Sequence, residues 1–300
     1  MSNAIVITEF GGPAVLQWRE VQPPAPQEGE VLIRVRAAGV GPTDLHIRAG
    51  HLAAVFPQRP GDVLGFEAAG VVEAVGEGAD ARVGDEVAAL LFAQGGYGEL
   101  VTATMWHPKP AAVTWEAAAA LPASAEAAVG TLRESRAVAG ETLVVLGAAG
   151  SVGSIIVQLA HSHGIRVIGV ASDRDADLVR ELGGEPFAYG ANVFDRIDTP
   201  VHAVIDAAGH GGLVDAVALT GDASRVVTLT GGPEVASSGA QMSHPGPDRA
   251  PDALAITMPL LANGQLRLKA RRSLPIREAA EAHRLLESGE THDKIVLTFK

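Results

Sequence analysis

Cysteine is absent from this 300-residue sequence. Its absence excludes disulfide bonds, a thiolate nucleophile and any metal site that depends on thiolate ligands. Basic residues are also few, since 23 lysines and arginines face 35 acidic residues, which gives a formal net charge of −12. A nucleic acid or an anionic membrane needs a basic face on its partner, so the charge argues against both and leaves room only for a local basic pocket.

Long apolar runs are missing as well. The longest, such as Ala117–Leu121 and Ile155–Ala160, are too short to cross a bilayer, and the N-terminal residues lack the pattern of a secretory signal. We therefore expect a cytoplasmic enzyme or binding protein. The length, the 35 glycines and the 47% of hydrophobic residues suit a soluble α/β protein of two domains, or of one domain with an insertion.

The N-terminal third predicts a β-rich domain. Short runs of strand-forming residues, separated by glycine and proline, occupy residues 30–36, 69–75 and 85–91. The pattern then changes to an alanine-rich run with helical spacing at 115–132, for which Thr114 is the expected N-cap.

From residue 141 onward strands and helices alternate, which is typical of a parallel sheet built from βαβ units. Residues 231–252 are rich in glycine, proline and serine and predict a long, mobile loop. A last helix and strand return to the first domain. The expected strands are 142–146, 166–170, 201–205, 225–229 and 294–299, and the expected helices are 154–163, 174–182 and 276–287. The expected domains are 1–115 with 266–300, and 116–265.

One stretch joins an apolar strand to a helix through closely spaced glycines: Leu143-Val-Val-Leu-Gly-Ala-Ala-Gly-Ser-Val-Gly-Ser154. Glycines there permit a tight turn, let the backbone approach a pyrophosphate and let the helix pack on the strand. The helix N-terminus presents free N–H groups and a positive dipole to the anion. The strand–turn–helix context favours a dinucleotide over a plain turn. The predicted contacts are Gly147, Ala148, Ala149, Gly150, Ser151, Val152 and Gly153.

The residues after the second strand bear on the choice of dinucleotide. NAD binding usually requires an acid at the end of that strand, where it binds the ribose diol. Here Ala171 follows the strand, whereas Ser172 and Arg174 suit a 2′-phosphate, so NADPH is favoured. Asp173 leaves an alternative open because it can bind the diol or cap the next helix, and Arg174 can equally be a solvated helix residue.

Taken in order, these motifs resemble the zinc-independent quinone oxidoreductase branch of the medium-chain dehydrogenases/reductases, a group that also includes enoyl reductase domains of polyketide synthases. The resemblance covers nearly the whole chain. Besides the glycine-rich turn, it is carried by residues 30–36, 38–40, 60–72 (PGDVLGFEAAGVV), 83–87 (VGDEV), 95–101 (GGYGELV), 119–122 (AALP), 279–286 and 294–297.

The resemblance implies a GroES-like β-rich catalytic domain, a doubly wound Rossmann cofactor domain and an active site in the cleft between them. It also implies homodimers formed edge to edge through the cofactor sheets. Tyr189 lies one position from where the family often places a tyrosine near the adenosine. The residues expected to flank the nicotinamide half of the cofactor are Ala207, Ala208 and Gly209 after the fourth strand, and Thr230 and Gly231 after the fifth.

The resemblance also bears on metal. The ligand positions of zinc-dependent relatives correspond here to Gly41, Phe66 and Ala123, none of which has a suitable side chain. Glu67 alone persists, and one carboxylate cannot hold a tetrahedral zinc. We therefore expect no metal.

The segment Gly39-Val-Gly-Pro-Thr-Asp-Leu-His46 remains ambiguous. Thr43 and His46 match the hydroxyl–imidazole proton relay of alcohol dehydrogenases of this superfamily, and such a relay can donate a proton without zinc. The alternative is that Thr43 and Asp44 cap a short helix while His46 lines its surface.

Aromatic residues predict an apolar pocket for a flat substrate, lined by Phe66 and Tyr97 with Phe56 and Trp106. Tyr97, in a glycine-rich turn, can stack on the substrate or simply pack. Other polar residues are expected to be structural: Glu126, which stands among alanines, to be solvated, and the isolated histidines to lie on the surface or in the core (His107, His202, His210 and His244).

The resulting hypothesis is transfer of hydride from NADPH to a quinone or an α,β-unsaturated carbonyl compound, without zinc. Two alternatives stay open. One is a zinc-free alcohol dehydrogenase or ketone reductase that uses Thr43 and His46. The other is a non-catalytic NADPH-binding redox sensor.

Overall fold

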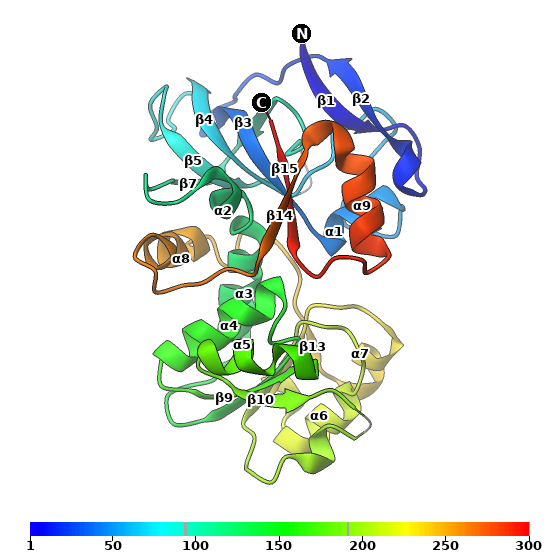
Figure 1. The fold of residues 1–300 in the computed structure, drawn as a ribbon, viewed down its shortest axis with the longest axis vertical. Coiled ribbons are helices and arrows are strands. Elements are labelled where there is room, and N and C mark those ends of the chain that lie inside the picture. The colour runs from blue at the N-terminus through cyan, green and yellow to red at the C-terminus, as the bar shows by residue number, and fades with distance from the viewer. Residues whose placement is uncertain (93–94, 191, 300) are drawn as a thin grey trace. The chain divides into compact units, whose positions relative to one another are not determined.

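A computed structural model describes residues 1–92, 95–190 and 192–299. The chain forms two compact units, and each is described by itself (Figure 1). The first unit consists of Met1–Ala123, Leu254–Asn263 and Ala270–Lys300, and the second of Ser124–Ala253 and Gly264–Lys269.

The first unit is built on a β-sheet with the strand order β14-β15-β3-β4-β5-β7, in which β6 also pairs with β3. All neighbours are antiparallel except β14 and β15. A separate hairpin, β1 (Ser2–Ile7) with β2 (Leu16–Val21), precedes the sheet. The strands of the sheet are β3 (Val31–Val40), β4 (Glu67–Val75), β5 (Glu86–Leu90), β6 (Leu100–Ala103), β7 (Met105–Pro108), β14 (Arg271–Pro275) and β15 (Lys294–Thr298).

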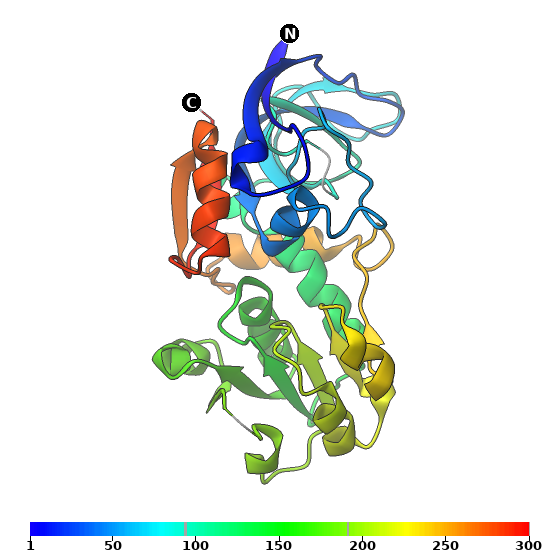
Figure 2. The same cartoon turned by 90° about the vertical axis from the view of Figure 1, so that its right-hand side faces the viewer.

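Alternation along β3 shows how this sheet is set. Exposed Arg34 and Arg36 alternate with buried Ile33 and Val35, because successive side chains point to opposite faces. Helix α2 (Trp115–Ala119) packs on β3 and β4, and α9 (Ala279–Glu287) lies beside β14 and β15 (Figure 2). The two remaining helices of this unit are α1 (Pro42–Arg48) and α8 (Ala253–Ala262), which starts at the boundary.

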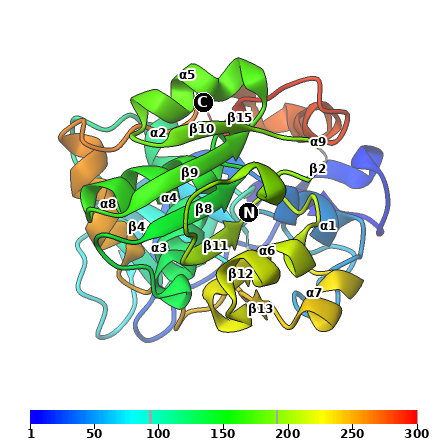
Figure 3. The same cartoon turned by 90° about the horizontal axis from the view of Figure 1, so that it is seen from below.

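The second unit contains a parallel six-stranded sheet with the order β10-β9-β8-β11-β12-β13 (Figure 3). Numbered from β8, this is the order 3-2-1-4-5-6 of a doubly wound dinucleotide-binding fold. The order in which strands are added to the sheet reverses between β8 and β11. β8 is buried throughout, as expected for a strand covered on both faces. The strands are β8 (Thr142–Leu146), β9 (Arg166–Ala171), β10 (Glu185–Ala188), β11 (Ala203–Asp206), β12 (Val226–Thr228) and β13 (Gln241–Met242). The helices are α3 (Pro122–Ser135), which begins at the boundary, α4 (Ser151–Ser162), α5 (Ala176–Glu181), α6 (Leu213–Thr220) and α7 (Pro233–Ser238).

The predicted fold class, a β-rich part and a doubly wound part, is confirmed. The units differ from the predicted boundaries, since the first extends to Ala123 and includes most of α8. The single helix expected at 115–132 is two helices. Thr114 caps α2 by accepting the N–H of Ala117 at 3.2 Å, and Pro122 begins α3, because proline suits the first turn of a helix and not its interior.

Two further expectations are corrected in the second unit. The segment 231–252 is not a structureless loop, since it contains α7 and β13. Glu126 is not solvated but buried, and it forms an ion pair with Arg249. None of the helices in the described parts of the chain is long and apolar enough to span a membrane.

Candidate functional site

The glycine-rich turn after β8 has the geometry of a pyrophosphate cradle. Gly147 has φ +83°, a conformation that strains other residues, and Gly150 is the N-cap of α4 but has no side chain to cover the helix N-terminus. A Cβ at Gly153 would lie 2.1 Å from the carbonyl oxygen of Gly147, so only glycine lets α4 pack this closely on the turn. The turn therefore fits a dinucleotide phosphate at a helix N-terminus.

Asp206, at the end of β11, organises the next two loops. One carboxylate oxygen accepts the N–H groups of Ala208 at 3.0 Å and Gly209 at 2.9 Å. The other accepts the hydroxyls of Thr228 at 2.9 Å and Thr230 at 3.3 Å. Asp206 is 1% exposed, so these bonds are made in the core. The residues expected to flank the nicotinamide are thereby brought together around one carboxylate.

The role of Asp206 was missed from the sequence. The available signal was a carboxylate that ends an otherwise apolar strand and precedes Ala207-Ala208-Gly209. A buried acid of this kind requires hydrogen-bond donors, and consecutive backbone N–H groups after the strand are the nearest ones.

The residues predicted to select the cofactor lie together after β9. The Ser172 hydroxyl donates to a carboxylate oxygen of Asp175 at 2.5 Å, and Nε of Arg174 lies 3.7 Å from the same oxygen. The Arg174 side chain is 57% exposed. Asp175, rather than the exposed Asp173, is thus the acid that accompanies this pair.

Tyr189 follows β10 and donates its backbone N–H to Ala171 at the end of β9, at 3.0 Å. Its ring meets that of His210 edge to face, with centroids 5.2 Å apart. Partial burial raises the pKa of the Tyr189 hydroxyl above its usual value. The two rings therefore belong to the same edge of the parallel sheet as the glycine-rich turn.

In the first unit, Gly41 is the N-cap of α1, and Asp44, three positions later, completes the capping box. The Asp44 carboxylate accepts the N–H of Gly41 at 2.8 Å, and Asp44 is 1% exposed. His46 is exposed on the same helix, with its Nδ1 3.4 Å from that of His51. Among the described residues Thr43 makes no hydrogen bond to His46, so the capping interpretation holds for Asp44 and the proton relay stays a prediction.

Two buried charged groups, Lys294 and Glu67, lie close to Asp44 of this helix. Lys294 Nζ is 2.6 Å from one Glu67 oxygen, and the other Glu67 oxygen accepts the N–H of Ala123 at 2.8 Å. Burial raises the pKa of Asp44 to about 7, an effect that Glu67 reinforces and that the Gly41 N–H and Lys294 oppose. Glu67 is therefore committed to an ammonium group and a backbone donor.

These residues do not fit a zinc ion. Gly41, Phe66 and Ala123 offer no ligand atom, and Glu67 is already paired. Within residues 1–92, 95–190 and 192–299 no cluster of three or more His, Cys, Asp or Glu side chains could hold a metal. We derive no step that uses a metal.

Tyr97 is packed inside the first unit. It is fully buried, and its hydroxyl lies 3.1 Å from Nε2 of His283. Burial, together with the positive charge of Arg48, lowers the pKa of His283 to about 3. The burial of the ring agrees with the alternative that Tyr97 simply packs, and its catalytic role stays a prediction. Phe66 is 6% exposed and meets Phe56 edge to face at 5.5 Å, so it too is largely enclosed.

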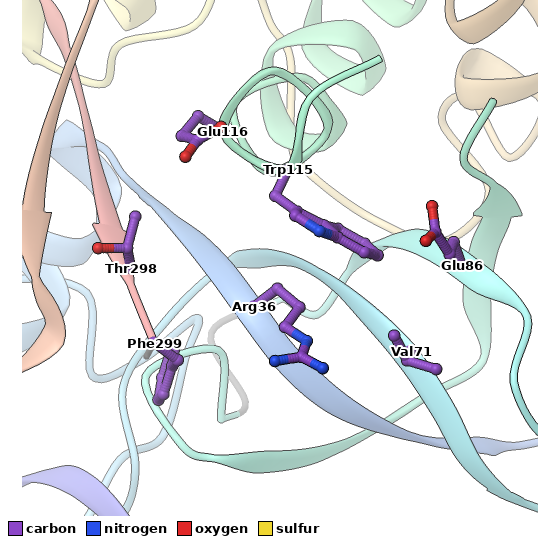
Figure 4. Close-up of a pocket in the computed structure, with 7 residues that line it drawn as sticks. All are labelled: Arg36, Val71, Glu86, Trp115, Glu116, Thr298 and Phe299. Atoms are coloured by element: carbon purple, nitrogen blue, oxygen red, sulfur yellow. The ribbon is translucent and has the colours of Figure 1, made fainter. Parts of the chain in front are cut away.

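The first unit also has a surface pocket of about 340 Å³ that contains none of the predicted site residues. In Figure 4 the Arg36 guanidinium and the Trp115 ring border this pocket. Its lining is Arg36, Val71, Glu86, Trp115, Glu116, Thr298 and Phe299.

Comparison with known proteins places this architecture in a family. Residues 27–146 match the model of the alcohol dehydrogenase GroES-like domain, and residues 172–297 match a model described as zinc-binding dehydrogenase. The chain is 38% identical to quinone oxidoreductase of Rattus norvegicus over 66% of this chain and 62% of that protein. It is 35% identical to quinone oxidoreductase of Mus musculus over 76% of this chain and 73% of that protein. It is 30% identical to the chloroplastic NADPH-dependent alkenal/one oxidoreductase of Arabidopsis thaliana over 98% and 79%.

Solved structures agree with these matches. The quinone oxidoreductase of Coxiella burnetii superposes with a TM-score of 0.87 at 26% identity, over 100% of this chain and 99% of that one. Mycobacterial Rv1454c, solved in complex with NADPH, superposes with a TM-score of 0.79 at 27% identity, over 99% and 100%. The fold and the matches define an oxidoreductase of the medium-chain dehydrogenase/reductase superfamily. Within it, the chain belongs to the quinone oxidoreductase family, which confirms the resemblance and the class of enzyme inferred from the sequence.

Proposed function

We propose that this protein transfers hydride from NADPH to a quinone or an α,β-unsaturated carbonyl compound, without zinc. The observation that carries the proposal is the position of the glycine-rich turn and the Asp206-centred loops. Both lie at the carboxyl ends of β8, β11 and β12, where parallel sheets of this order bind dinucleotides. The names of the quinone and alkenal/one oxidoreductases and the NADPH complex of a structural relative support it.

In this proposal the second unit binds and orients the cofactor. Bound NADPH supplies the hydride. The turn at Gly147–Gly153 holds the pyrophosphate, and Ser172 with Arg174 contacts the 2′-phosphate. Asp206 holds Gly209 and Thr230 in place for the nicotinamide half.

The first unit supplies groups for the substrate oxygen. Reduction leaves negative charge on that oxygen, and the half-buried hydroxyl of Thr43 is the proposed donor that stabilises it. His46 is exposed, so its imidazole can exchange protons with water and act as the proton source.

Turnover of NADPH with a panel of quinones and enones tests the proposal. We expect at least one acceptor to be reduced while NADPH is consumed, by a protein that purifies without bound zinc. No NADPH consumption across the whole panel, or stoichiometric zinc that resists chelation, would contradict it.

The two alternatives predict different outcomes. A ketone reductase that depends on a Thr43–His46 relay would reduce simple ketones, whereas the proposed enzyme would reduce only quinones and enones. The absence of a Thr43–His46 hydrogen bond in the described structure makes this alternative the weaker one. A redox sensor would bind NADPH tightly, and none of the acceptors in the panel would lead to its oxidation.

We also propose an edge-to-edge homodimer. Over the described residues β13 is the edge strand of the parallel sheet, so its outer backbone groups are available to pair with a second copy. Light scattering at several concentrations tests this, and a monomer throughout would contradict it.

A further inference from the structure

Arg249 joins the segment after β12 to helix α3 through a buried ion pair. Its Nε donates to one oxygen of Glu126 at 2.7 Å, and a terminal nitrogen contacts the second oxygen. The other terminal nitrogen donates to the Ser243 hydroxyl at 2.8 Å. The Arg249 and Glu126 side chains are only 6% and 3% exposed. A bidentate pair of this kind fixes direction as well as distance.

Helix α3 is shaped to receive this arginine. Gly130 lies four residues after Glu126, so both positions face the same side of the helix. A Cβ at Gly130 would lie 2.5 Å from Cγ and 2.7 Å from Cδ of Arg249. Because Gly130 has no side chain, the aliphatic part of the Arg249 side chain has room to pass over the helix and reach Glu126.

A second, exposed pair follows on the same helix. Arg133 donates to both oxygens of Asp252 at 2.7 and 2.8 Å, but these side chains are 49% and 50% exposed. Exposed ion pairs contribute little to stability, whereas removal of one partner from a buried pair leaves an uncompensated charge in the core. The buried pair is thus the effective anchor, and the exposed pair serves as its internal control.

The anchored segment is the one that continues from the predicted nicotinamide loop. Thr228 and Thr230 bond to Asp206, and the N–H of Ser243 donates to the carbonyl of Thr228 at 2.9 Å. Since Ser243 also accepts from Arg249, a continuous set of polar contacts runs from the end of β11 to α3. Every member of this set lies in the second unit.

We propose that Glu126 and Arg249 are positioning residues that clamp segment 229–252 onto α3 and thereby hold Thr230 and Gly231 for the nicotinamide half of the cofactor. The proposal rests on the proposed function for the identity of the ligand. It does not involve contact of either side chain with the cofactor. It explains why a segment with the composition of a mobile loop is folded.

Two measurements on Arg249→Met, Arg249→Lys, Glu126→Gln and Gly130→Ala test the clamp. The first is hydrogen exchange of the cofactor-free protein. We expect exchange in segment 229–248 to rise at least about tenfold in Arg249→Met, Glu126→Gln and Gly130→Ala, with β8 and β9 unchanged. Arg249→Lys keeps the charge but not the bidentate geometry, so an intermediate effect is expected. Asp252→Asn should change little.

The second measurement is calorimetric binding of NADPH and of 2′,5′-ADP, which contains only the adenosine half. Each of the three disruptive variants should weaken NADPH about tenfold and leave 2′,5′-ADP within about twofold of wild type. Gly130→Ala is the most telling variant, because glycine to alanine within a helix is normally stabilising and leaves both charges in place.

The outcomes separate this proposal from the proposed function. If wild-type protein binds both ligands and the variants weaken both equally, or weaken neither, the clamp is not a positioning device and this inference is overturned. If wild-type protein binds neither ligand, the proposed function fails and the inference fails with it.

Discussion

The ammonium group of Lys294, at the start of β15, lies 2.6 Å from the carboxylate of Glu67, at the start of β4, and the pair crosses β3 at Gly39. A Cβ at Gly39 would lie 2.1 Å from the bonded Glu67 oxygen, so only glycine leaves room for the pair. Both partners are nearly inaccessible to water. The pair therefore ties the C-terminal strand β15 to β4 across β3.

Lys294→Met is expected to lower the free energy of unfolding by about 3–5 kcal/mol, because Glu67 would be left buried without its partner. Chemical denaturation measures this. The double variant Lys294→Met/Glu67→Gln should recover part of the loss. Arg166→Met, which breaks an ion pair whose side chains are about half exposed, should cost less than about 1 kcal/mol. Equal effects of the two single variants would contradict the buried pair.

Asp44 makes stability depend on pH. Its pKa is about 7 in the folded protein and near 3.8 when exposed, so the folded state binds the proton more tightly. The stability that the protonated form contributes is complete below pH 4 and is lost as the pH rises to about 7. Relative to Asp44→Asn, the wild type should lose up to about 4 kcal/mol over this range and stay level above it.

Denaturation of both proteins from pH 4 to about 8 gives that difference directly. Asp85→Asn is the matched control, since Asp85 accepts a comparable backbone N–H from Arg82 at 2.8 Å on the surface. If the free energies of unfolding of the wild type and of Asp44→Asn differ by the same amount at every pH, the pKa of Asp44 is not raised by folding and this account of Asp44 is contradicted.

Tyr97→Phe tests whether that residue is catalytic or simply packs. The ring is buried and only its hydroxyl contacts His283, so we expect kcat and KM for the best acceptor to change less than about twofold, with a stability loss of about 1 kcal/mol. A loss of activity above tenfold in a variant that stays folded would place Tyr97 in the catalytic site.

The glycine-rich turn and the units of the parallel sheet were predictable because their patterns are local: the first strand, turn and helix follow one another from Thr142 to Ser162. Contacts between distant residues left no such pattern. Glu126 looked solvated among alanines because its partner, Arg249, is 123 positions away. The contact of Asp206 with Thr228, 22 residues later, was hidden for the same reason, whereas its local contacts with Ala208 and Gly209 left a signal that was overlooked.

The burial of Tyr97 was hard to predict for a different reason. Glycine-rich turns usually lie at the surface, which suggested an accessible ring. Here the glycines make room for the tyrosine, since a Cβ at Gly65 would lie 2.7 Å from its Cδ1. Sequence alone does not distinguish a glycine that opens a turn from one that admits a neighbouring side chain.

Cofactor selectivity should follow the three side chains after β9. Arg174→Ala is expected to weaken NADPH about tenfold and leave NADH unchanged, because a charge-assisted hydrogen bond to the 2′-phosphate is lost. Asp175→Asn should favour NADPH a few-fold, because it removes a carboxylate beside Ser172 and Arg174.

Fluorescence titration with NADPH and with NADH measures the ratio of their two dissociation constants. Arg180→Ala provides the control, since Arg180 is similarly exposed and pairs with Asp177 on α5. A shift in the ratio caused equally by Arg180→Ala would reduce the effect to general surface charge.

Calorimetric titration of NADPH into wild type, Gly147→Ala and Gly140→Ala tests the central claim most directly. Both glycines have a positive φ, +83° and +86°, so both substitutions should cost about 1–2 kcal/mol of stability. Only a Cβ at Gly147 meets neighbours, 3.2 Å from Ala207 and Ala208, whereas one at Gly140 has nothing within 4 Å. The account predicts that wild type and Gly140→Ala bind NADPH alike and that Gly147→Ala binds it at least about tenfold more weakly. No binding to the wild type, or equal weakening by both substitutions, would contradict it.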